Sequence, residues 1–184
     1  MQKSIVLLFL IAFFSSCQKK ETAPVVVKPT ENFLEKTDLY SKVFYISTNL
    51  NADCLAYNIG CDCCDGKIIF LSNGAFVSDF YCVPSEIYNT GTFDIENKKL
   101  VLEYSHKQAI FGPEKEDYSQ EEESTLRLDS INLGKVSLDI IKCKGKYIFK
   151  SKEDYYSEDK KTSFSVAMNQ YKTKGVWKLL DVKE

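Results

Sequence analysis

Histidine is nearly absent from this sequence, and its scarcity bears on catalysis. His106 is the single histidine in 184 residues, and no cysteine or acidic residue is patterned around it. A Ser–His or Cys–His nucleophile would have to use this residue. The G-x-S-x-G and H-E-x-x-H motifs are missing, as is a glycine-rich loop for phosphate. We therefore predict that the chain is not an enzyme and that His106 is a surface residue at the end of a strand.

The sequence also lacks any concentration of positive charge. Lysine and arginine number 24 against 26 acidic residues, so the formal net charge is −2. Loss of Lys3 with an N-terminal leader would change this charge from −2 to −3. Because nucleic-acid-binding domains carry a basic stripe or patch, we expect no nucleic acid partner.

Long apolar runs are missing as well, and the one run near the N-terminus is short. Ile5 to Phe14 carries no charge and follows Lys3. Ten residues are too few to cross a bilayer, which takes about 20, so the segment fits a secretory signal instead. No later stretch is apolar enough to span a membrane.

A cysteine stands where this apolar run stops. The run ends in Phe14-Ser15-Ser16-Cys17 and turns polar at Gln18. Small residues before such a cysteine resemble the bacterial lipobox, in which the cysteine is acylated and becomes the first residue of the mature chain. Phe14 stands in place of the usual leucine. The alternative interpretation is an ordinary signal peptide with a chance cysteine.

Lipidation of Cys17 would determine where the protein is held. Each buried methylene of an acyl chain contributes about 0.8 kcal/mol, and stable attachment takes more than one chain. A Cys17 that carries several acyl chains, palmitate among them, meets this requirement, so we expect the lipid bilayer as a partner. The predicted location is the cell envelope, in the outer membrane, facing either the periplasm or the cell surface.

The chain divides into three predicted parts. Residues 1–16 are the signal peptide, and residues 17–38 are the lipidated cysteine with a flexible tether interrupted by Pro24 and Pro29. Residues 39–184 form a single domain, which is long enough to bury a hydrophobic core.

Alternation of apolar and polar residues recurs along the predicted domain, and Ser72-Asn73-Gly74 is a strong hairpin signal. Clear alternation or strand-like patterns occur at residues 100–104, 126–129, 136–140, 164–168 and 176–182. Period-two alternation places one face of a strand on a core, and no segment shows helical periodicity over more than two turns. The sequence therefore predicts an all-β fold, an antiparallel meander or β-barrel of about eight to ten short strands.

The segment from Glu114 to Glu123 is strongly acidic, with six acids and one lysine. A calcium loop is one interpretation, but the spacing of an EF-hand is absent. Runs of like charge are usually solvated loops, so we predict a solvated loop here.

Six cysteines remain after Cys17, namely Cys54, Cys61, Cys63, Cys64, Cys82 and Cys143. Export places them in an oxidising compartment, where an even count favours disulfides. We expect disulfides to fasten the irregular segment from Asn49 to Gly66 onto the barrel, for example through Cys82 and Cys143. Adjacent Cys63 and Cys64 are expected to reach different partners.

A soft-metal site is the alternative for the clustered cysteines. Cys61, Cys63 and Cys64 lie within four residues, so three sulfurs could meet on one ion, with Cys54 or Cys82 as a fourth ligand. Thiolates select ions such as Cu(I) and Zn(II). Copper is therefore the one cofactor that the sequence suggests, and otherwise we expect none.

The segment that starts at Cys61 also resembles a known lipoprotein family. A C-x-x-C pair, Cys61 and Cys64, precedes a strand that ends in Asn73-Gly74-Ala75-Phe76. This pattern resembles the N-terminal domain of the NlpE family, envelope lipoproteins linked to copper resistance and surface-stress sensing. The resemblance covers about residues 50–105, and the extra Cys63 departs from the family pattern. It implies a lipocalin-like β-barrel opened by a cysteine pair.

Three functional hypotheses remain open. The leading one is a membrane-anchored, non-enzymatic binding or interaction module that holds a small apolar ligand or contacts an envelope protein. The second is a copper-handling or envelope-stress-sensing lipoprotein that uses Cys61, Cys63 and Cys64. The third is a structural envelope component without a site. We expect an apolar cavity for the first, clustered reduced thiols for the second, and neither for the third.

Overall fold

The computed structural model describes residues 33–58, 65–82, 84–113 and 123–183. The predicted signal peptide, Cys17, Cys61, Cys63 and Cys64, and residues 114–122 of the acidic segment lie outside the described residues. The described residues belong to one compact unit that begins at Phe33. Leu34, which lies in the segment predicted as the tether, packs in its core.

The described residues form eleven strands and three short helices. The strands are β1 (Val43–Ser47), β2 (Asn49–Leu50), β3 (Ala56–Tyr57), β4 (Asp65–Phe70), β5 (Ala75–Cys82), β6 (Ser85–Glu96), β7 (Lys99–Gly112), β8 (Thr125–Ser130), β9 (Lys135–Cys143), β10 (Lys146–Lys150) and β11 (Tyr155–Glu158). The helices are the 3₁₀ helix η1 (Lys36–Leu39), α1 (Phe164–Thr173) and α2 (Val176–Leu179).

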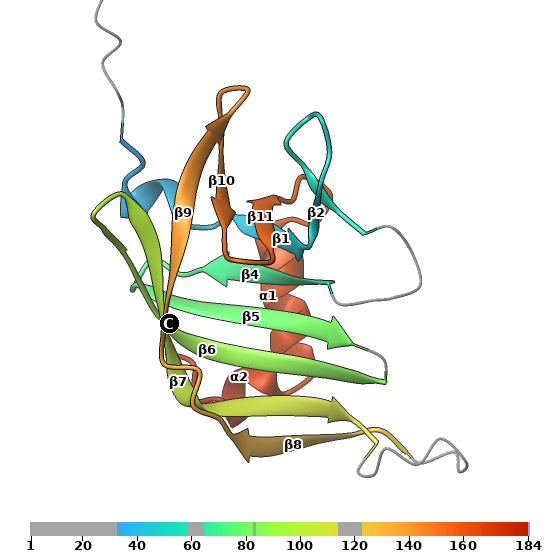
Figure 1. Cartoon of the computed structure of the whole chain (residues 1–184). Helices are drawn as coiled ribbons and strands as arrows, with labels where there is room; N and C mark the ends of the chain where they lie inside the picture. Colours follow the sequence, from blue (N-terminus) through green and yellow to red (C-terminus); the bar gives the residue numbers. More distant parts are fainter. Residues whose placement is uncertain (1–32, 59–64, 83, 114–122, 184) are drawn as a thin grey trace, which may run out of the picture. The chain divides into compact units, whose positions relative to one another are not determined.

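Eight of these strands close into an antiparallel barrel, which confirms the predicted fold class. Neighbouring strands around it are β1, β4, β5, β6, β7, β9, β10 and β11, and β11 pairs with β1 again. β7 is long enough to pair with two strands along one edge. Its first half pairs with β9 and its second half with β8, so β8 extends the wall of the barrel beside β7 (Figure 1).

Large apolar side chains fill one half of the barrel interior. They are Phe44, Ile68, Phe70, Phe76, Phe93, Leu100, Leu102, Leu138 and Phe149. The ring centroids of Phe70 and Phe93 lie 4.6 Å apart, and those of Phe44 and Phe149 lie 5.0 Å apart. Gly91 lets the wall fold tightly around these rings, because a Cβ there would lie 2.0 Å from the Glu103 carbonyl oxygen.

A C-terminal helix covers the outer face of the barrel, so the strands predicted at residues 164–168 and 176–182 are wrong. Residues 164–173 form α1 and residues 176–179 form α2. Ser163 caps α1, because its hydroxyl accepts a hydrogen bond from the Val166 backbone N–H. Ala167 and Tyr171 lie one helical turn apart, and both are buried. They pack with Val43, Ile69 and Val77 in a second core outside the barrel.

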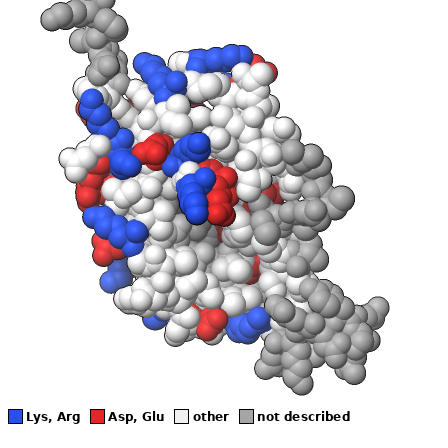
Figure 2. Space-filling view, viewed as in Figure 1, with Lys and Arg blue, Asp and Glu red and all other residues white. Residues whose placement is uncertain are grey.

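The surface carries charges of both signs. Figure 2 shows basic and acidic side chains next to one another in several places on the face that it draws. Lys99 and Asp139 form an exposed ion pair, with 2.8 Å between Nζ and Oδ1. Such exposed pairs contribute little to stability.

No helix in the part of the chain that the structure describes is long and apolar enough to cross a membrane.

Candidate functional site

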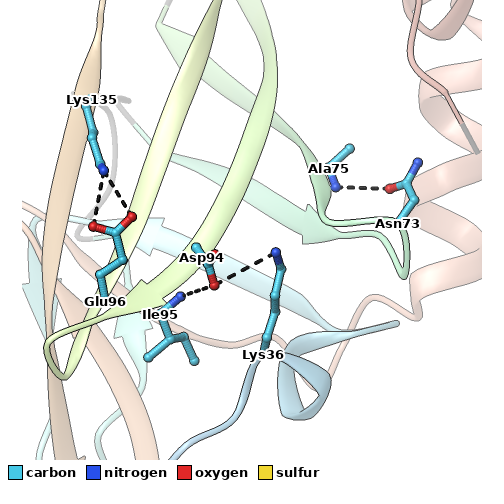
Figure 3. A network of polar contacts seen from close by, with 7 residues as sticks. All are labelled: Lys36, Asn73, Ala75, Asp94, Ile95, Glu96 and Lys135. Atoms are coloured by element: carbon cyan, nitrogen blue, oxygen red, sulfur yellow. Dashed lines mark hydrogen bonds and ion pairs between the residues drawn. The ribbon is translucent and has the colours of Figure 1, made fainter.

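One end of the barrel is closed by the residues around η1. Lys36 of η1 lies 3.9 Å from Oδ1 of Asp94 on β6, and its ammonium also lies 5.0 Å from the centre of the Phe93 ring. Lys135 of β9 contacts both carboxylate oxygens of Glu96, at 3.0 and 3.1 Å (Figure 3). The Asn73 side chain accepts a hydrogen bond from the Ala75 N–H and orders the β4–β5 turn. Polar contacts and packed rings thus close this end of the barrel. A ligand would therefore enter at the other end.

At that other end the barrel interior opens to solvent through a cavity of about 270 Å³. Its lining residues are Ile46, Ser78, Asp79, Phe80, Ile87, Asn89, Tyr104, Gln108, Ile131, Leu133, Asp154 and Tyr156. They come from β1, β5, β6, β7 and β11, from the β8–β9 connection and from the β10–β11 turn. Apolar side chains form part of the wall, and amide, hydroxyl and carboxyl groups form the rest. This mixture is typical of a small-molecule site.

Two amide side chains in this wall carry buried oxygens without a partner. Asn89 and Gln108 are 9% and 8% exposed and face each other across the β6–β7 pairing. Neither Asn89 Oδ1 nor Gln108 Oε1 has a hydrogen-bond partner among the described residues. The Gln108 amide is oriented by its nitrogen, which donates to Asp129 Oδ2 at 3.2 Å. Since a carboxylate only accepts, the oxygen of Gln108 is the atom left unsatisfied.

Asp154 and two tyrosines make the same cavity electronegative. Burial raises the pKa of Tyr104 to about 12, with a further contribution from the nearby Asp154 charge. Burial, together with Tyr104 and Asp154, also raises the pKa of Tyr156. The pKa of Asp154 is itself raised by burial, and a hydrogen bond from the Ser151 hydroxyl partly opposes this change. None of the described lining residues is a lysine or an arginine.

A second polar cluster lies outside the barrel, between its wall and α1, beside a hollow of about 400 Å³. Asp79 accepts hydrogen bonds from the Lys67 backbone N–H at 2.6 Å and from the Tyr171 hydroxyl at 3.0 Å. Lys174 contacts the carboxylate of Glu86 and donates to the Tyr88 hydroxyl at 2.9 Å. These groups satisfy one another, so we interpret the cluster as the attachment of α1 rather than as a ligand site.

The structure joins Cys54 to Cys143, which confirms a disulfide at this pair of the predicted cysteines. Their Cα atoms lie 6.0 Å apart. The bond fastens the loop between β2 and β3 to the end of β9, as we expected for the segment from Asn49 to Gly66. Cys82 is also disulfide-bonded, and its partner is not among the described residues.

The other residues predicted from the sequence are His106 and the cysteines of the metal site. His106 is exposed and lies within β7, not at the end of a strand, because β7 continues to Gly112. The described residues contain no group of three His, Cys, Asp or Glu side chains that could hold a metal ion. Cys61, Cys63 and Cys64 lie outside the described residues, so the copper site stays a prediction.

Asn89 and Gln108 were not singled out in the sequence. A weak signal exists, because each is a polar residue at an inward position of a strand. Asn89 and Tyr88 take opposite faces of β6, and Tyr88 packs in the outer core. The inward position of an amide becomes visible only once the register of β6 and β7 is known.

Comparisons with known proteins give one structural likeness. No family model and no curated protein matches the sequence, so the resemblance to the NlpE family stays a prediction. A streptavidin-like protein from Bacteroides eggerthii superposes with a TM-score of 0.49 and 11% identity. The match covers 76% of this chain and 95% of that one.

Proposed function

We propose that this protein is a membrane-anchored envelope lipoprotein whose barrel binds a small molecule without transforming it. The observation that carries this proposal is the pair of unsatisfied amide oxygens, Asn89 Oδ1 and Gln108 Oε1, in the wall of the cavity. A buried acceptor without a partner costs about 1–3 kcal/mol. Native barrels rarely keep two such atoms side by side unless something else completes them.

The cavity is large enough for a ligand to complete these atoms. Its volume of about 270 Å³ corresponds to about nine water molecules. Small barrels are often filled entirely by side chains, but here a cavity remains beside Ser78, Asn89 and Gln108. Ile87, Ile131 and Leu133 would contact the apolar body of a ligand. Both amide oxygens are closed off from solvent in this conformation, so the side chains of Asn89 and Gln108 would rotate toward the cavity to accept a hydrogen bond from the ligand.

Filling the cavity is expected to abolish binding. Ser78→Phe places a ring in the cavity, since Ser78 is buried and lines it. We expect small molecules that bind the full chain in a ligand-observed NMR screen of a fragment library to lose at least about tenfold in affinity to this variant, because shape complementarity is lost.

The matched control is Ser137→Phe, which adds the same ring at an exposed position of β9. Ser78→Leu is a smaller substitution for use if Ser78→Phe fails to fold, as judged by circular dichroism. Retained binding in both Ser78 variants, or no binding to the unaltered chain, would contradict the proposed function.

Anchoring through Cys17 is the second part of the proposal. The lipobox-like Phe14-Ser15-Ser16-Cys17 supports it. Cys17→Ala is expected to abolish the incorporation of labelled palmitate and to move the protein out of the membrane fraction, because no acyl chain then holds it. Ser15→Ala keeps a small residue before the cysteine and should retain the label. Label on the Cys17→Ala variant would overturn this assignment.

The copper-handling function implied by the NlpE resemblance is the alternative. It depends on Cys61, Cys63 and Cys64, and nothing in the described part of the chain favours it over ligand binding.

A further inference from the structure

The polar groups of the cavity wall supply several hydrogen-bond acceptors, and two of them are amide oxygens without a partner among the described residues. Gln108 Oε1 and Asn89 Oδ1 accept only, and so does an ionised Asp154 carboxylate. The hydroxyls of Tyr104 and Tyr156 accept as well as donate. Since no lysine or arginine stands among the described lining residues, the cavity offers negative potential without a cation to balance it.

We propose that the ligand of this cavity is a small organic ammonium ion with an apolar body, an inference that rests on the proposed function. Three polar groups of the wall would bind this ion. Asp154 supplies the opposite charge, and the amide oxygens of Asn89 and Gln108 accept the ammonium N–H groups.

The two tyrosines suit a cation for a second reason. Tyr104 and Tyr156 both lie in the interior of the barrel and line the cavity beside Asp154. The face of an aromatic ring attracts a cation within about 6 Å of its centre. Their rings and hydroxyl oxygens therefore add to the attraction of Asp154 without bringing a competing positive charge.

Asp154 is held in place for this purpose by its own turn. Its backbone N–H donates to the Ser151 hydroxyl oxygen at 2.8 Å, and Ser151 Oγ lies 3.3 Å from Asp154 Oδ2. A carboxylate fixed in the lining of the cavity repels an anion. A neutral alcohol has no charge to pair with it and only one donor for the two amide oxygens.

Three probes of nearly equal shape distinguish an ammonium ion, a neutral alcohol and an anion as ligands. They are 2-phenylethylammonium, 2-phenylethanol and phenylacetate. Each is titrated calorimetrically into the full chain in detergent micelles, with a blank titration into micelles alone. We expect 2-phenylethylammonium to bind at least about tenfold more tightly than the alcohol, as for a charge-assisted hydrogen bond. Phenylacetate is expected not to bind.

A pair of adjacent substitutions tests the role of the carboxylate. Asp154→Asn keeps the shape of the side chain and is expected to weaken ammonium binding about tenfold or more, with less than about a twofold effect on the alcohol. Glu153→Gln removes the same charge one residue away, from a residue that does not line the cavity. It should leave both affinities unchanged, which separates a direct contact from a general effect of net charge.

The pH dependence adds a second readout. The Ser151 hydroxyl and Glu153, both in the same turn, act on the pKa of Asp154. The other titratable groups in the lining are Asp79, Tyr104 and Tyr156. The phenols stay neutral at acidic pH, so ammonium affinity is expected to fall as pH drops through the pKa of Asp154. This dependence should be much reduced in Asp154→Asn, which leaves Asp79 as the one carboxyl group in the described lining.

The outcomes distinguish the ligand class from the function itself. If alcohol or phenylacetate binds as tightly as the ammonium and Ser78→Phe abolishes that binding, the inference fails and the binding function stands. The same holds if the ammonium does not bind while other fragments do. If no molecule binds in the cavity, both fail.

Discussion

Replacing Cys54 and Cys143 together by serine is expected to lower the free energy of unfolding by about 4 kcal/mol. The two cysteines are 89 residues apart in the chain, and a cross-link over so long a loop strongly restricts the unfolded state. Among the described residues the bond is the one covalent link between this loop and β9, and β2 and β3 on either side of the loop are two residues each. Urea unfolding of the oxidised protein, followed by tyrosine fluorescence, measures the change.

The matched control removes a non-covalent link between the same two segments. Lys144 Nζ lies 3.0 Å from Asp53 Oδ1, and both side chains are exposed. Asp53→Asn with Lys144→Met should leave the midpoint of unfolding where it is, because exposed ion pairs contribute little. If the double serine variant unfolded at the same urea concentration as the unaltered protein, the disulfide would not be the main connection between these segments.

The barrel could be predicted because the sequence patterns of its strands and turns are local. Residues 100–104 and 136–140 alternate in the sequence, and in the structure Leu100, Leu102 and Leu138 are fully buried inside the barrel. The hairpin signal at Ser72-Asn73-Gly74 is also confirmed, since Gly74 adopts a positive φ in the turn between β4 and β5. Alternation and turn chemistry report directly on each strand.

The C-terminal helix could not be predicted from its own residues, because they fit two periods. Phe164, Val166 and Met168 alternate as in a strand, yet Val166 is 48% exposed while Ala167 is buried. The decisive signal lies elsewhere, in the run from Ile68 to Leu71. Four consecutive apolar residues indicate a strand buried on both faces. Such a strand needs a covering element outside the barrel, which α1 provides.

The cavity and the pairing of Cys54 with Cys143 could not be predicted from the sequence for a different reason. Burial of the Asn89 and Gln108 amides depends on the register between β6 and β7, which contains an irregularity between Asn89 and Gly91. The disulfide between Cys54 and Cys143 depends on the β2–β3 and β9–β10 hairpins lying next to each other. Neither juxtaposition leaves a pattern in nearby sequence, whereas the cysteine count alone predicted that disulfides exist.

Truncation of Tyr171 is expected to detach α1 from the barrel and to lower the free energy of unfolding strongly. Tyr171 is 2% exposed, packs edge-on against Tyr88 with 5.9 Å between ring centres, and donates to Asp79. Tyr171→Ala should lower the free energy of unfolding by about 4 kcal/mol, as for other large buried rings. Tyr171→Phe keeps the ring and should cost about 1–2 kcal/mol for the lost hydrogen bond. Denaturant unfolding measures both.

Val166→Ala is the control on the same helix, since Val166 is exposed and should change stability by less than about 0.5 kcal/mol. Equal losses in Tyr171→Ala and Val166→Ala would mean that α1 is not anchored by the buried ring.

The pH dependence of these variants tests the hydrogen bond to Asp79 separately. Burial raises the pKa of Asp79 in the folded state, although the Lys67 N–H and the Tyr171 hydroxyl oppose the rise. The stability that Asp79 contributes is therefore present below its unfolded pKa and is lost as pH rises through its folded pKa. Tyr171→Phe removes one opposing donor, so its stability should fall further with rising pH than that of the unaltered protein. Below the folded pKa the difference between the two should shrink, because the hydrogen bond then goes to a neutral carboxyl group. A difference that stays constant over this range would show that the Tyr171 hydroxyl does not stabilise the ionised form of Asp79.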